Sequence, residues 1–159
     1  YGKTNPPSDS FKDISAGTHH ACGHLLDGKA KCWGWNWYGQ TATQQDTFLE
    51  IAAGGNHTCG VTETGAMKCW GVNGYNQSDA TEGNYMKVSA GSHFTCGLLS
   101  DGYVECWGLN EQGQTNPPND AFVDLVAGYE HACGLLASGQ VKCWGANGWK
   151  QSTPPVFGN

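Results

Sequence analysis

Residues 90–114 read AGSHFTCGLLSDGYVECWGLNEQGQ, and three other stretches of the chain repeat this pattern. Its first cysteine recurs every 37 residues, and so do its second cysteine and the tryptophan that follows. The recurring positions are Cys22, Cys59, Cys96 and Cys133, then Cys32, Cys69, Cys106 and Cys143, then Trp33, Trp70, Trp107 and Trp144. A fixed period of this length predicts an architecture of stacked repeats or propeller blades.

Each copy opens with a segment whose alternation predicts a β-strand with one buried face. In the first copy, residues 11–16, the buried face is predicted to consist of Lys12, Ile14 and Ala16, which alternate with Phe11, Asp13 and Ser15. The matching positions in the later copies are Leu49, Ile51 and Ala53, then Met86, Val88 and Ala90, then Val123, Leu125 and Ala127.

A β-hairpin is predicted next, because each copy has a glycine at the place of a tight turn. A three-residue loop over Leu26, Asp27 and Gly28 suits a type I turn followed by a left-handed glycine. This loop fixes the register, so that Cys22 faces Cys32 and His24 faces Ala30. The other apolar pairs are then Val61 with Met67, Leu98 with Val104 and Leu135 with Val141.

The same register predicts one disulfide in each repeat, as an even number of regularly spaced cysteines also suggests. The predicted bridges are Cys22–Cys32, Cys59–Cys69, Cys96–Cys106 and Cys133–Cys143. Reduced thiols in the core are the main alternative. Zinc is a weaker one, since the chain has no CxxC pair.

Other recurring positions are interpreted as scaffold. The tryptophan after the second cysteine is expected to pack between neighbouring sheets. Asn36, Asn73, Asn110 and Asn147 are expected to shape turns, in a loop that also holds Gln40, Gln77, Gln114 and Gln151. His20, His57 and His131 recur and are interpreted as hydrogen-bonded structural residues, with Phe94 in the third copy.

The pattern AG-x-x-H-x-C-G-L-x-x-D-G-x-V-x-C-W-G-x-N-x-x-G-Q resembles the repeat of the regulator of chromosome condensation family over essentially the whole chain. The short repeat is most similar to a compact, cysteine-containing secreted branch. That branch includes the β-lactamase-inhibitor propellers and the ectodomains of some plant receptor kinases. The resemblance implies an all-β fold, a β-propeller of short antiparallel blades, here with four 37-residue repeats and one disulfide per repeat.

The chain is interpreted as a single repeat domain, 1–159, with repeats at about 11–47, 48–84, 85–121 and 122–159 and a partial preceding repeat at 1–10. Family members usually close seven blades, so four copies leave closure open. Three arrangements are open: the four copies form a ring, two chains combine as a homo-oligomer, or the copies belong to a longer array. Closure by some route is expected, because open sheet edges are avoided.

Composition and motifs argue against several function classes. The net charge of −6 and pI of about 5.3 disfavour nucleic-acid binding, and no apolar run is long enough for membrane insertion. No nucleophile elbow, HExxH motif or phosphate loop is present, so the chain is expected to be no enzyme, without cofactor or metal. A transition-metal site on His20 and His24 is a minor alternative, because no partner ligand is suitably spaced.

Two stretches vary between copies and are expected to be loops that bind a ligand. One follows the CWG triplet, at residues 35–38, 72–75, 109–112 and 146–149, and the other precedes the hairpin, at residues 18–19, 55–56, 92–93 and 129–130. The predicted ligand-binding residues are Trp35, Trp37, Tyr38, Tyr75, Trp149 and Tyr129. Packing over the blade ends is an equal alternative for Tyr38, Tyr75 and Trp149.

The predicted function is a secreted, non-catalytic binding module that recognises carbohydrate through these aromatic loops. Aromatic faces stack on sugar rings, and low charge suits a neutral ligand. The alternative is a protein-interaction module, either an inhibitor or a receptor ectodomain, which would use one asymmetric patch. The concentration of Trp35, Trp37 and Tyr38 in the first copy favours that alternative.

Overall fold

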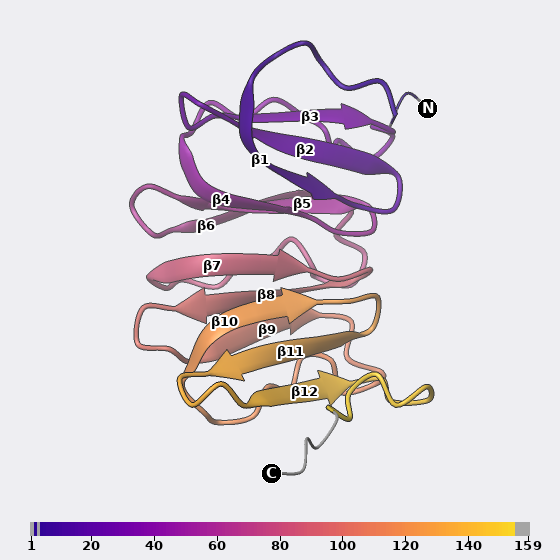
Figure 1. The fold of residues 1–159 in the computed structure, drawn as a ribbon. Coiled ribbons are helices and arrows are strands. Elements are labelled where there is room, and N and C mark those ends of the chain that lie inside the picture. The colour runs from indigo at the N-terminus through magenta and orange to yellow at the C-terminus, as the bar shows by residue number, and fades with distance from the viewer. Residues whose placement is uncertain (1, 3, 155–159) are drawn as a thin grey trace.

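The structure is a computed structural model that describes residue 2 and residues 4–154. Residues 1, 3 and 155–159, which belong to the two ends of the predicted repeat array, lie outside the described part. Within it the chain forms four three-stranded antiparallel sheets in sequence order, here called blades 1 to 4. The blades are stacked one after another, with the two chain ends at opposite ends of the stack (Figure 1).

Each blade is a meander in which the middle strand pairs with both neighbours. Blade 1 consists of β1 (Phe11–Ala16), β2 (His20–Leu25) and β3 (Ala30–Gly34), and blade 2 of β4 (Phe48–Ala53), β5 (His57–Thr62) and β6 (Met67–Gly71). Blade 3 consists of β7 (Tyr85–Ala90), β8 (Phe94–Leu99) and β9 (Val104–Gly108), and blade 4 of β10 (Phe122–Ala127), β11 (His131–Leu136) and β12 (Val141–Gly145).

The predicted hairpin register is confirmed in every blade. Cys22 pairs with Cys32 and His24 with Ala30, and the turn glycine Gly28 has a φ of 87°, as a left-handed turn position requires. All four predicted disulfides are formed, and none of the cysteines is free. The local pairing follows because the turn places the two cysteines directly opposite each other on adjacent strands.

The predicted buried face of the first strand is partly wrong. Leu49 and Met86 are half exposed, whereas Phe48 and Tyr85, one residue earlier, are buried. The register shifts by a bulge between positions 48 and 50 and between positions 85 and 87, as it also does in the other two blades. A bulge adds one residue to one strand and reverses the alternation at that point. Val123 and Lys12 are therefore also outside the core, whereas Ile51, Val88 and Leu125 are buried as predicted.

Neighbouring blades are joined through a glutamine of the preceding blade. The backbone carbonyl of Gln40 accepts hydrogen bonds from Trp70 Nε1 at 3.0 Å and from the Thr58 hydroxyl at 2.8 Å. The same contacts join Gln77 to Trp107 and Thr95. This confirms that the recurring tryptophan packs between sheets, and it gives the glutamine a structural role.

A buried histidine completes these contacts. His20 Nε2 lies 2.7 Å from the Thr58 hydroxyl and His57 Nε2 lies 2.8 Å from that of Thr95. Each hydroxyl already donates its proton to a glutamine carbonyl, so the histidine Nε2 must donate. Burial lowers the pKa of both histidines from 6.5 to about 4, so the rings are neutral at pH 7 and carry their proton on Nε2.

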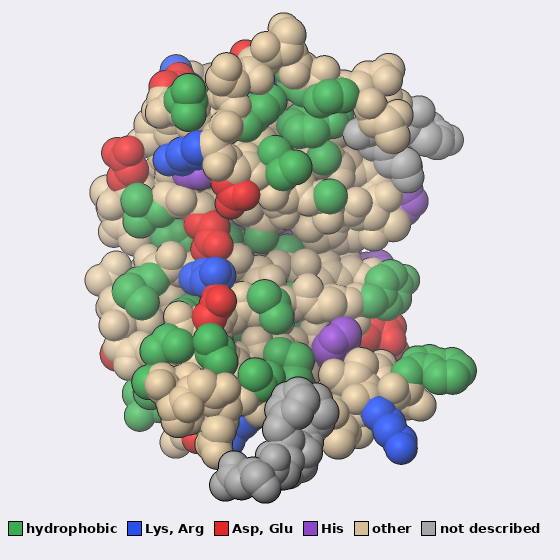
Figure 2. All heavy atoms as spheres, in the orientation of Figure 1, with side chains coloured by type: hydrophobic (Ala, Val, Ile, Leu, Met, Phe, Trp, Pro, Cys, Tyr) green, Lys and Arg blue, Asp and Glu red, His purple; other side chains and the backbone are tan. Residues whose placement is uncertain are grey.

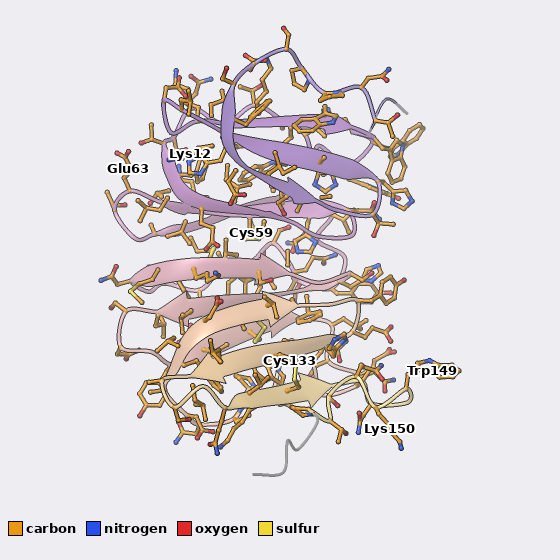
Figure 3. All side chains as sticks on the ribbon, viewed as in Figure 1. Lys12, Cys59, Glu63, Cys133, Trp149 and Lys150 are labelled. Atoms are coloured by element: carbon orange, nitrogen blue, oxygen red, sulfur yellow. A yellow bond between two sulfur atoms is a disulfide. The ribbon has the colours of Figure 1, made fainter. Side chains whose placement is uncertain are left out.

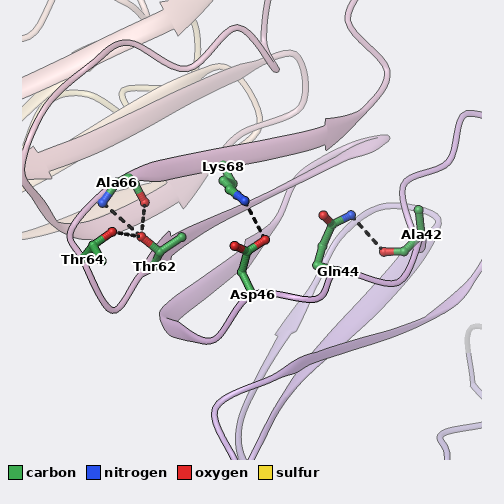
Figure 4. A network of polar contacts seen from close by, with 7 residues as sticks. All are labelled: Ala42, Gln44, Asp46, Thr62, Thr64, Ala66 and Lys68. Carbon is green, nitrogen blue, oxygen red and sulfur yellow. Dashed lines mark hydrogen bonds and ion pairs between the residues drawn. The ribbon is translucent and has the colours of Figure 1, made fainter.

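The segment that enters a blade is tied to its last strand by an ion pair. In blade 2, Lys68 Nζ lies 2.6 Å from Asp46, while Thr62 closes the adjacent turn through Thr64 and Ala66 (Figure 4). Lys31 with Asp9 and Lys142 with Asp120 repeat the ion pair in two other blades. These pairs are partly exposed, so each stabilises the fold by at most about 1 kcal/mol.

Blade 1 and blade 4 do not meet in the view of Figure 1, and each end of the stack exposes a blade face. Ile14 is 70% exposed, whereas its equivalents Ile51, Val88 and Leu125 are at most 8% exposed because a preceding blade covers them. The four blades therefore form an open arc rather than a ring closed on itself.

Candidate functional site

The two variable stretches of each repeat lie side by side. Trp35 donates its backbone N–H to the carbonyl of His19 at 3.0 Å, and Val72 donates to Asn56 at 2.8 Å. The same bond joins Leu109 to His93 and Ala146 to Glu130. The pairing arises because one stretch follows the last strand of the blade and the other precedes the middle strand. Together the eight stretches form one edge of the molecule, here called the loop edge.

Figure 3 shows the two edges of the stack. Trp149 and Lys150 project from the loop edge, while Glu63 lies on the opposite edge, where the hairpin turns are found. Cys59 and Cys133 lie between the edges, within the sheets. The disulfides therefore hold the strands that present the loops, without forming part of the loop edge.

Recurring side chains fix the shape of each loop. Asn36 Oδ1 accepts the backbone N–H of Thr41 at 2.9 Å, and Gln40 Oε1 accepts that of Tyr38 at 3.1 Å. Equivalent bonds are made by Asn73 and Gln77, by Asn110 and Gln114, and by Asn147 and Gln151. The predicted turn-shaping role of the asparagines is confirmed, and the variable residues are held on rigid turns.

One position of this turn needs a left-handed backbone. It is glycine in two copies, Gly39 with a φ of 79° and Gly113 with a φ of 78°, but Asn76 and Lys150 have a φ of 62° there. A side chain with a Cβ costs about 1–2 kcal/mol in this region, and asparagine tolerates it better than lysine.

We therefore expect Lys150→Gly to raise the free energy of unfolding by about 1 kcal/mol, which is a rise of about 2–4 °C in melting temperature. Differential scanning calorimetry measures it. Asn76→Gly is the matched control and should give a smaller rise. A lower melting temperature for Lys150→Gly would contradict the conclusion that the backbone of Lys150 is strained.

The predicted site residues all lie at the loop edge, but in different settings. Trp37 is 80% and Trp149 is 91% exposed, and both project from it. Trp35 is partly buried, because it stacks edge-on between His19 and Tyr38, with ring centroids at 5.2 and 5.3 Å.

Tyr129 lies apart from the other aromatic residues. It lines a hollow of about 310 Å³ where the first strands of all four blades end, together with residues 16–18, 53–55 and 90–92. Small residues and backbone dominate this hollow, and the Tyr129 carbonyl accepts the N–H of Ser92 at 3.0 Å.

The structure brings Tyr38 and Tyr75 together in one open groove of about 390 Å³ on the loop edge. Asn56, Asn73 and His93 also line it. The His93 ring packs edge-on against Tyr75, with centroids 5.2 Å apart, and its Nδ1 lies 2.8 Å from the Ser92 hydroxyl. The groove thus combines two aromatic side chains with amide and imidazole groups that can form hydrogen bonds.

Asn56 and His93 were not among the predicted site residues. Both belong to the variable stretch before the hairpin, at the same position in the repeat as His19, which hydrogen-bonds Asn56 Oδ1 at 2.9 Å. The sequence signal for these two residues was that this position differs between the copies. Only the pairing of the loops shows that they face Tyr38 and Tyr75.

Several other site types find no support in the described part of the chain. It contains no group of three potential metal-ligating side chains, and His20 Nε2 is bonded to Thr58 instead. His24, in the middle strand of the first blade, is buried, and burial lowers its pKa. No helix of the described residues is long and apolar enough to cross a membrane.

One group of charged side chains lies on the first strands of the blades. Figure 2 shows acidic and basic side chains mainly in one column across the blades. Lys87 lies 2.7 Å from Asp124 and 3.7 Å from Glu50, so it bridges blades 2 to 4. Its bond to Asp124 raises the pKa of Lys87 and lowers that of Asp124, as expected for an ion pair.

Comparison with known proteins agrees with this architecture. The model of the regulator of chromosome condensation (RCC1) repeat matches residues 11–40, 48–77, 87–114 and 122–148. A comparison with curated proteins gives no match.

Among solved structures, the ectodomain of the Physcomitrella patens receptor kinase CR4 is 30% identical, with a TM-score of 0.76. The match covers 87% of this chain and 40% of that one. The CRINKLY WD40 ectodomain of the Arabidopsis thaliana receptor kinase ACR4 is 28% identical, with a TM-score of 0.76, and the match covers 92% of this chain and 54% of that one.

Yeast RCC1 (Prp20), solved bound to Kap60, shares the fold at 16% identity and a TM-score of 0.75, over 90% of this chain and 45% of that one. The chain therefore spans about half the length, or less, of these three similar structures.

Proposed function

The chain belongs to the RCC1 repeat family, and we propose that it is an extracellular, non-catalytic module that binds a protein partner through the loop edge. The observation that carries this proposal is the unequal distribution of exposed aromatic side chains. Trp37 is 80% exposed where the other copies have Gly74, Glu111 and Gly148. Aromatic residues of this kind are frequent anchors of protein interfaces.

The surroundings of Trp37 support the same proposal. Its loop is fixed by Asn36 and Gln40, so the indole is presented from a rigid turn and loses little conformational freedom on binding. Half-exposed Tyr38 and Tyr75 continue the aromatic surface into the next blade. An asymmetric patch of this kind suits a single partner surface better than four equivalent ligands.

Four disulfides and the resemblance to two receptor ectodomains support the extracellular location. Yeast RCC1 (Prp20), which shares the fold, was solved bound to Kap60, and this also supports a protein partner.

A carbohydrate ligand is the second candidate, and the groove between Tyr38 and Tyr75 is the observation that favours it. Its volume of about 390 Å³ is in the range of small-ligand sites. Tyrosine faces stack on sugar rings, and Asn56, Asn73 and His93 supply hydrogen-bonding groups for hydroxyls. This candidate depends on the groove, whereas the protein partner depends first on Trp37.

The first test is the binding of the oxidised protein to a glycan array and to a library of displayed extracellular proteins. We expect protein ligands, and we expect Trp37→Ala to weaken their binding at least about 10-fold. The melting temperature should stay within about 2 °C, because the side chain is exposed. Titration calorimetry and thermal denaturation measure the two effects.

Tyr103→Ala is the matched control. Tyr103 is 45% exposed, but it follows a hairpin turn on the opposite edge, so its loss should leave binding unchanged. Glycan hits that are lost in Tyr75→Ala and retained in Trp37→Ala would favour the second candidate. Binding that is unchanged in both variants would refute the loop edge as the site.

A further inference from the structure

No described residue of the chain covers the outer face of blade 4. Val141 is 43% exposed, whereas its equivalents Ala30, Met67 and Val104 are at most 9% exposed. Cys133 and Leu135 are partly exposed for the same reason, although Cys22, Cys59, Cys96, Val61 and Leu98 are buried. An apolar hollow of about 190 Å³ lies on this face, between Leu125, Val126, Cys133, Leu135 and Val141.

The three covered interfaces follow a pairing rule at one position. A histidine of one blade meets a threonine of the next in His20 with Thr58 and in His57 with Thr95. At the third interface Phe94 replaces the histidine, and Ala132 replaces the threonine. Phe94 and Ala132 are both completely buried in one apolar cluster. A polar side chain therefore meets a polar one, and an apolar side chain meets an apolar one.

Blade 4 presents the polar member of this pair. The ring of His131 packs over Gly128 as the ring of His57 packs over Gly54, so His131 takes the same orientation. His131 and Gln151 are both partly exposed, whereas His57 and Gln77 are completely buried. Among the described residues, no hydroxyl takes the place that Thr58 and Thr95 occupy at the earlier interfaces.

A second copy of this chain does not complete the pair. Its blade 1 would place Ala21 opposite His131, where the rule requires threonine. At the position of Lys87, a basic residue of a further blade would pair with Asp124 as Lys87 does, whereas Asp13 of a second copy would not. An unpaired buried imidazole would weaken such a dimer.

We infer that the outer face of blade 4 is a docking surface for one further blade of this repeat type, which carries threonine at the position of Thr58 and a basic residue at the position of Lys87. The threonine hydroxyl accepts from His131 and donates to the Gln151 carbonyl. A tryptophan Nε1 of the same blade donates to that carbonyl, and an aliphatic first strand covers Val141 and Leu135. Blade 3 of this chain is a blade of this kind, since it carries Thr95 and Lys87.

The test appends a fifth blade to the chain. A copy of residues 81–121 placed directly after residue 154 continues the repeat in register. Four proteins are compared, with His131 or His131→Phe in the host blade and with Thr95 or Thr95→Ala in the appended copy. We expect the matched combinations, histidine with threonine and phenylalanine with alanine, to melt about 3–6 °C above the mismatched ones.

A general effect of hydrophobicity cannot make both matched combinations more stable than both mismatched ones. His131→Phe in the unextended chain measures the intrinsic effect of that substitution and is subtracted. Equal effects of Thr95→Ala in both hosts would overturn the inference. So would a stable dimer of the unextended chain in sedimentation experiments if it protects Cys133 and Cys143 from reduction, because the occupant would then be a second copy.

Discussion

Reduction of all four disulfides is expected to unfold the protein at 37 °C. Each bridge joins cysteines ten residues apart, and closing such a loop stabilises the folded state by roughly 2–3 kcal/mol on the chain-entropy model. Four bridges together contribute about 8–12 kcal/mol, which is comparable with the whole stability of an ordinary domain, about 5–15 kcal/mol. Far-UV circular dichroism of the fully reduced, alkylated chain measures the loss.

The order of reduction follows from the open arc. Cys133 and Cys143 are both partly exposed on the outer face of blade 4, whereas Cys22, Cys59 and Cys96 have no exposed surface. The Cys133–Cys143 bridge should therefore react first with dithiothreitol. Alkylation of samples taken along the titration, followed by peptide mass spectrometry, identifies the bridge that opens at each step.

Paired alanine variants provide the control. Removing Cys133 and Cys143 should leave a folded protein that is about 2–3 kcal/mol less stable. Removing Cys59 and Cys69 should cost more, because it also leaves a cavity in a buried cluster. A reduced chain that melts cooperatively near the temperature of the oxidised one would show that packing alone maintains the blades.

Much of the scaffold was predictable because the period separates it from the variable residues. The turn glycine and the paired cysteines fixed the hairpin register, which then fixed the disulfides. The bulge was not predictable in this way. Six residues of alternation look the same with or without one inserted residue, so Leu49 was predicted on the buried face and Phe48 opposite to it, whereas Phe48 is the buried one.

The loop edge was only partly predictable for a different reason. Variation between copies identified the loops, but the adjacency of Tyr38, Asn56 and Tyr75 depends on the stacking of one blade on the next. The pairing of His20 with Thr58 likewise joins residues of two repeats. In the sequence, the only sign of this contact is that Phe94 replaces the histidine and Ala132 replaces the threonine of the next repeat. The two changes can be related only when the contact is known.

The buried histidines are expected to make the protein unstable in weak acid. His20 and His57 have a pKa of about 4 in the folded state and 6.5 when exposed, because burial disfavours the imidazolium. Between these values the unfolded chain binds protons that the folded chain does not bind. Stability is therefore complete above pH 6.5 and falls as the pH drops towards 4.

The expected loss is large at mild pH. Each histidine should lower the free energy of unfolding by about 2 kcal/mol between pH 7 and pH 5, and by about 3 kcal/mol at pH 4. Protonation also removes the neutral ring that fits between Thr58 and its neighbours, so the interfaces of blades 1 to 3 should open together. Urea denaturation at a series of pH values from 7 to 5 measures the effect, above the range in which most carboxylates titrate.

The chain itself provides the control, since the interface between blades 3 and 4 has an apolar pair in place of the histidine and the threonine. Replacing His57 with phenylalanine and Thr95 with alanine reproduces the pair of Phe94 and Ala132 between blades 2 and 3. The Gln77 carbonyl keeps its bond from Trp107 in this variant, as the Gln114 carbonyl keeps that from Trp144. The variant should lose about half of the pH dependence and keep its stability at pH 7. A pH profile identical to that of the unmodified protein would show that the acid sensitivity lies elsewhere, in groups other than the buried imidazoles.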